Sequence, residues 1–162
     1  MPGNTKRRKP GRPAREIGKL PVTLRQRFDS DTHLKLVPLE HLDKILRGDG
    51  DNEAFCTLAY RLLVGEGLAR AHFDHQPEAM TTMNDAKRAL HAVGTRYHKT
   101  GRVGFTGDEY RALSPAINLI DDMQNLTTRR QQREAYRAVE PKVGSLGMTL
   151  TALEVQPVGV QQ

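Results

Sequence analysis

The spacing of apolar residues constrains the fold most, because they recur at steps of three and four from residue 37 to residue 126. Such spacing is typical of amphipathic helices, which bury one face against a common core. Proline at a helix start and glycine just after a helix end place the boundaries. The pattern predicts helices from Pro38 to Gly48, from about Asn52 to Phe73, from Pro77 through Tyr97, from Thr106 to Leu113 and from Ser114 to Leu126.

Small residues leave two interpretations open for the helix predicted between 52 and 73. Gly65 and Ala69 are four residues apart, so another helix can approach closely there. Gly65 and Gly67 also cost this helix roughly 1 kcal/mol each, so a break is the alternative. Further on, Thr106 and Glu109 have the spacing of a capping box, in which each side chain bonds the backbone amide of the other residue.

The segment "TTRRQQREAYR" that follows Leu126 is polar nearly all round. We expect the helix there to run past the body, into solvent or onto a partner, until Pro141 and Gly144 stop it. The last residues contain "LGMTLTALEV", which fits a strand. The sequence therefore predicts a mainly α protein with a small bundle of four to five helices at 37–140. An extended tether or short strand at 21–36 precedes the bundle, and a weakly structured C-terminal tail at 141–162 follows it.

Basic residues are concentrated at one end of the chain. Residues 1–27 contain nine Lys or Arg and one acid, whereas residues 28–162 contain 16 basic and 18 acidic side chains. Residues 1–20 also hold three prolines and three glycines, and their few apolar side chains cannot offset the entropy of ordering. The sequence predicts a disordered basic arm at 1–20 that seeks a polyanion, attached to a nearly neutral body.

Within this arm, Gly11-Arg12-Pro13 resembles the core of an AT-hook. The resemblance implies that Arg12 enters the minor groove of A·T-rich DNA, where negative potential attracts arginine. Glycine lets the backbone approach the groove, and proline keeps it extended. Pro10 stands where the family core normally has an arginine, so one groove-inserting side chain is missing. The flanking cations would contact phosphates; they are Lys6, Arg7, Arg8, Lys9 and Arg15.

A second basic strip follows from helical spacing near the C-terminus. Arg129, Arg133 and Arg137 are four residues apart, and Arg130 lies seven before Arg137. On a helix they form one flank. This flank is either a second phosphate contact, a docking face for an acidic partner, or a solvated helix end, and pairing of Arg130 with Glu134 favours the last.

No set of residues predicts catalysis, a metal site or a cofactor. The segment His72-Phe73-Asp74-His75 lacks the spacing of a helical zinc pair, and Cys56, the only cysteine, is expected in the apolar core. The glycines of "GRVGFTG" precede a helix start, where an anion can bind free amides, but a plain loop is preferred because no strand precedes it. With no membrane-length apolar run and no signal peptide, we expect a cytoplasmic protein, or a nuclear one in a eukaryotic host.

These observations together predict a non-enzymatic, nucleic-acid-associated regulator or accessory protein. Its arm would contact DNA, more readily than RNA, and its helical body would form a homo-oligomer or bind a protein. Five to seven phosphate contacts give weak, salt-sensitive binding, so two arms in one oligomer would help. The alternative is a protein-binding adaptor or inhibitor that acts through its helical surface, with a basic arm that only aids solubility or carries an import signal.

Overall fold

The computed structural model describes residues 35–155, and these residues are mainly helical, as predicted. The arm at 1–20, residues 21–34 of the predicted tether and the chain end at 156–162 lie outside the described residues. Residues 35 and 36, the last two of the predicted tether, are helical and not extended. Within 35–155 no strand forms, and a single antiparallel bridge joins Gly50 to Val103. The helices are residues 35–46, α2 (Asn52–His72), α3 (Pro77–Thr100), α4 (Gly107–Leu126), α5 (Arg129–Val139), the 3-10 turn η2 (Glu140–Lys142) and α6 (Leu146–Leu153).

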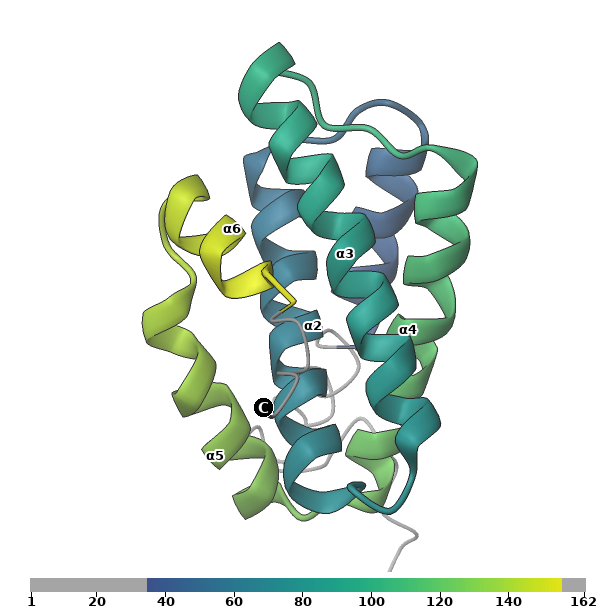
Figure 1. Ribbon diagram of the computed structural model, residues 1–162, viewed down its shortest axis with the longest axis vertical. Helices are drawn as coiled ribbons and strands as arrows, with labels where there is room; N and C mark the ends of the chain where they lie inside the picture. The colour runs from purple at the N-terminus through teal and green to yellow at the C-terminus, as the bar shows by residue number, and fades with distance from the viewer. Residues whose placement is uncertain (1–34, 156–162) are drawn as a thin grey trace, which may run out of the picture. The chain divides into compact units, whose positions relative to one another are not determined.

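Helices α2, α3 and α4 form the centre of the bundle and contact one another pairwise (Figure 1). The helix at 35–46 runs antiparallel to α4. Lys35 at its beginning bonds Asn125 at the end of α4, while the loop after it bridges to Val103, just before α4 begins. Helix α5 lies on the other side of α2, and α6 crosses α2 and packs against both α2 and α3 (Figure 1). None of the described helices is long and apolar enough to cross a membrane.

The helix starts follow the expected capping chemistry. Asp51, one residue before the predicted Asn52, caps α2 by accepting a hydrogen bond from the Ala54 amide at 2.9 Å. Pro77 opens α3, where its missing amide proton costs nothing. Thr106 and Glu109 form the predicted capping box of α4. Residues 35–37 are already helical ahead of Pro38, which lies inside the first described turns of that helix.

Close packing at Gly65 keeps α2 continuous, so the alternative of a broken helix is wrong. A Cβ added to Gly65 would lie 2.6 Å from Ile120 Cδ1 of α4 and 3.0 Å from Met83 Sδ of α3. This is the close approach that the sequence predicted. Because both neighbours are fully buried, the apolar surface removed from water there outweighs the low helix propensity of glycine.

Three expectations for the second half of the chain are corrected. Helix α4 does not stop at Leu113 but runs through Pro115, because buried Leu113, Ala116 and Ile117 hold it against α2 and α3. The helix does not continue past the body after Leu126: it breaks at residues 127–128, and α5 folds back against α2. The segment that fits a strand forms α6, which buries Leu153 and Thr149 against the core.

Candidate nucleic-acid interface

The structure describes four of the twelve residues predicted to contact nucleic acid, and these four lie on α5. Arg129, Arg130, Arg133 and Arg137 are all exposed on this helix, and we refer to them as the arginine face. The other eight lie outside the described residues, so contact between arm and DNA stays a prediction; they are Lys6, Arg7, Arg8, Lys9, Gly11, Arg12, Pro13 and Arg15.

Local chemistry begins and ends α5 where it does. Thr128 accepts a hydrogen bond from the Gln131 amide at 3.3 Å, and the Gln131 side chain accepts one from the Thr128 amide at 2.8 Å. This capping box satisfies two amide groups that a helix start would leave without partners. Pro141 then ends the helix through the 3-10 turn η2. The result is a helix of 11 residues set apart from α4.

Two arginines of the arginine face differ from the arginines of the other labelled helices in their ion pairing. Every arginine of α2, α3 and α4 forms an ion pair with a carboxylate. On α5, Arg130 pairs with Glu134 at 2.9 Å, as its spacing predicted, whereas Arg133 and Arg137 form no ion pair or hydrogen bond with a residue the structure describes. Residues 129–142 carry five basic and two acidic side chains. This segment therefore has more basic than acidic side chains, and two of its arginines, Arg133 and Arg137, have no carboxylate partner among residues 35–155.

The opposite side of α5 is fixed to the bundle by Tyr136. Its ring stacks on Tyr60 of α2, with centroids 5.8 Å apart and planes at 25°. Nearby, Gln132 Nε2 donates to the Gln124 carbonyl at 2.7 Å, and Val139 is buried in the core. Burial raises the pKa of Tyr60, and the nearby Tyr136 and Glu140 add to the shift. Tyr60 therefore stays protonated and donates to the Tyr136 carbonyl at 3.5 Å.

Beneath Tyr136 lies a buried polar network that the sequence pattern did not predict. Arg61 of α2 is almost fully buried and donates to Gln124 Oε1 at 2.8 Å and to the Tyr136 hydroxyl at 3.3 Å. It also forms an ion pair with Asp121, and Gln124 Nε2 donates to the Tyr136 hydroxyl at 2.8 Å. The sequence signal is an arginine between Tyr60 and Leu62 in an otherwise apolar stretch. The network links α2, α4 and α5, and so orients the arginine face.

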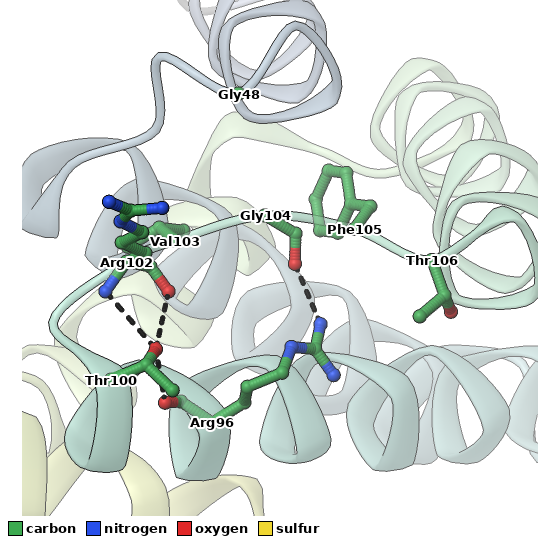
Figure 2. A pocket seen from close by; sticks show the side chains of 8 residues that line it. All are labelled: Gly48, Arg96, Thr100, Arg102, Val103, Gly104, Phe105 and Thr106. Atoms are coloured by element: carbon green, nitrogen blue, oxygen red, sulfur yellow. Dashed lines mark hydrogen bonds between the residues drawn. The ribbon is translucent and has the colours of Figure 1, made fainter.

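The glycine-rich loop forms an open hollow of about 730 Å³ next to the start of α4 (Figure 2). Arg96 reaches across it and donates to the Gly104 carbonyl at 2.7 Å (Figure 2). Arg96 also binds both carboxylate oxygens of Glu109, at 2.9 and 2.7 Å, and Glu109 accepts from the Thr106 amide. Because Arg96 and this amide already have partners, the geometry favours the plain loop over an anion site.

The remaining candidates from the sequence do not converge. His72 lies near Gln131, with 3.3 Å between ring and amide nitrogens, while Asp74 and His75 are exposed. Among residues 35–155 no group of three or more His, Cys, Asp or Glu is placed to hold a metal ion. Cys56 is half-buried at the edge of the core, where its thiol donates to Asn52 Oδ1 at 3.8 Å. Burial raises the pKa of this thiol, and the nearby Thr149 side chain offsets only part of the increase. Such a thiol is a poor nucleophile.

Comparison with protein-family models, with curated proteins and with solved structures finds no match for this chain.

Proposed function

We propose that this chain is a non-enzymatic, nucleic-acid-associated protein whose basic N-terminal segment and arginine face both contact phosphates. The observation that carries the proposal is the unpaired state of Arg133 and Arg137 among the described residues, on a helix whose other side is fixed to the bundle. Cations held in this way attract a polyanion without first breaking internal ion pairs.

The charge of the described residues supports this assignment of roles. Residues 35–155 carry 16 basic and 16 acidic side chains, so the bundle as a whole has no excess charge. The surplus on α5 is therefore local, and together with the basic residues of 1–27 it supplies the cations for binding. Phosphate contact of this kind is insensitive to sequence. Any preference for A·T-rich duplexes would come from Arg12 and the minor groove.

The test measures binding to A·T-rich and G·C-rich duplexes at two salt concentrations, with four proteins. They are the full chain, a chain that starts at Val22, the variant R133Q/R137Q, and the control R88Q/R111Q, which removes two exposed, paired arginines from α3 and α4. Each variant must keep the helical circular dichroism of the full chain. The control has the same net charge as R133Q/R137Q, so it separates the arginine face from charge in general.

We expect the chain that starts at Val22 to bind weakly, because seven Lys or Arg precede this residue. R133Q/R137Q should lower the slope of log affinity against log salt by about two, whereas R88Q/R111Q should leave it nearly unchanged. Equal losses in the two variants would contradict a role for the arginine face. If no form of the chain binds a duplex, the proposal fails and the adaptor or inhibitor function is favoured instead.

A further inference from the structure

We propose that the helix at residues 35–46 pairs with the same helix of a second copy of this chain, in antiparallel orientation. The pairing surface is the leucine face, which we define as the exposed side chains of Leu36, Leu39 and Leu46. This inference concerns self-association, so it does not depend on nucleic-acid binding.

The first observation is that exposed apolar side chains are concentrated at this helix. Five large apolar residues are well exposed among residues 35–155, and three of them form the leucine face, with exposed fractions of 48%, 39% and 48%. A fourth, Leu126, is 76% exposed at the end of α4, next to Asn125, which accepts a hydrogen bond from Lys35 at 3.1 Å. Only Met148 lies elsewhere, on α6. Concentration of this kind marks an interaction surface, whereas single exposed leucines do not.

The second observation is that the leucine face is distinct from the side of the helix that faces the core. Leu42 and Ile45 are buried in the core, so they form the side of this helix that packs against the bundle. The leucine face lies beside that side and includes the position of Asp43. Residues 36, 39, 43 and 46 follow the three-and-four spacing of a coiled-coil seam. The helix is therefore apolar on two adjoining sides, and the bundle covers one of them.

Charge complementarity identifies a second copy as the occupant. Glu40 and Arg47 are seven residues apart, so they lie on the same flank of the leucine face. Two such helices in antiparallel orientation place Glu40 of each copy against the partner's Arg47, and bring the partner's Leu46 next to Leu39. A twofold axis makes both contacts twice. Glu40 forms no ion pair with another residue that the structure describes, so it is available for this one.

Asp43 lies at the centre of the leucine face, close to the twofold axis. Its carboxylate binds Arg47 of the same helix at 2.8 Å, so its charge is compensated when two copies meet. Arginine has five donor groups and binds a second carboxylate at the same time. A polar residue at one seam position fixes the register of a coiled coil but lowers its stability. We therefore expect the pairing to be weak, and we expect replacement of Asp43 by an apolar residue to strengthen it. Each pair would carry two basic N-terminal segments, which raises their effective concentration toward one duplex.

The experiment measures the molar mass of the full chain by sedimentation equilibrium over a wide range of protein concentrations. The proposal predicts a monomer–dimer equilibrium. L39S should weaken it about a hundredfold, because each substitution removes two leucines from a symmetric interface. D43L should strengthen it at least about tenfold. M148S, which replaces the exposed methionine of α6, is the matched control and should leave the equilibrium unchanged.

Charge reversal tests the orientation. E40R places like charges opposite each other twice and should abolish pairing. E40R/R47E should restore most of it, because the arginine introduced at position 40 lies three residues before Asp43 and replaces Arg47 as its partner. A monomer at every concentration for both the full chain and D43L would overturn the proposal, and would show that another segment or another protein covers the leucine face. Pairing that survives L39S, or that E40R/R47E fails to restore, would also overturn it, because the interface would then lie elsewhere or have another orientation.

Discussion

Two glycines of α2 that lie two residues apart should respond to alanine in opposite ways. At Gly65, an added Cβ would lie 2.6 Å from Ile120 Cδ1 and 3.0 Å from Met83 Sδ, and closer still to Ile120 Cγ1. At Gly67, the nearest atom would be Ala135 Cβ, at an ordinary 3.9 Å. Intrinsic helix propensity favours alanine equally at both positions, so any difference between them reports packing.

The expected magnitudes follow from these distances. Alanine in place of glycine in a helix interior gains about 1 kcal/mol, and nothing opposes this gain at Gly67. At Gly65 the new methyl group has to displace Ile120, which is fully buried and belongs to the hydrophobic core. Overpacking of this kind costs about 1 to 3 kcal/mol. We expect G65A to lose about 1 to 2 kcal/mol of unfolding free energy, and G67A to gain about 1 kcal/mol.

Urea unfolding followed by circular dichroism measures both free energies in the full chain. Ile120→Val sharpens the assay, because valine lacks Cδ1, which is one of the two Ile120 atoms that the new methyl group would clash with. Ile120→Val should lower the free energy of unfolding less in the G65A background than in the native chain. If G65A is as stable as G67A, α4 does not approach α2 as the structure describes, and the packing argument for the continuity of α2 fails.

Three further predictions concern buried polar groups. Arg61→Ala leaves Asp121 and Gln124 without their donor, and we expect a loss of about 3 to 5 kcal/mol in urea unfolding. For Glu109, burial raises the pKa, but hydrogen bonds from Arg96 and Thr106 outweigh it and hold the pKa below the ordinary 4.5. Its contribution to stability is therefore complete above pH 4.5 and is lost as the pH falls through the lower folded value. E109Q should flatten the fall of unfolding free energy below pH 4.5. Cys56 should react more slowly with a thiol reagent in the folded chain than in urea, because burial raises its pKa; equal rates would contradict this.

The elements that the sequence predicted correctly are those with local signals. Pro77 at the start of α3 and the capping box of Thr106 and Glu109 are set by residues within one helical turn. The close approach at Gly65 was predictable as well, because small residues at four-residue spacing leave room for another helix. Of the candidate site, the spacing predicted a basic flank at Arg129–Arg137 and the pairing of Arg130 with Glu134.

The features that were mispredicted depend on contacts between distant segments. Pro115 ordinarily ends a helix, but the side chains buried on either side of it hold α4 together. The sequence of residues 129–139 is polar nearly all round, and only Val139 of α5 is fully buried, so the pattern predicted a solvated helix. What holds α5 is hydrogen bonding and ring stacking by Tyr136, whose partners Tyr60 and Arg61 lie about 75 residues away. No local pattern in a sequence specifies such a partnership.

The way in which α5 is attached has a consequence for the arginine face. A helix of 11 residues is marginal by itself in water, and Val139 is the one residue of α5 that is fully buried. Its orientation therefore depends on Tyr136, and through Tyr136 on Arg61 and Gln124. A buried arginine costs free energy to desolvate, and an apolar residue of similar volume often gives equal or greater stability. The presence of Arg61 is easier to understand if its role is to fix the position of α5, since a purely apolar contact would hold the helix without specifying which side faces outward.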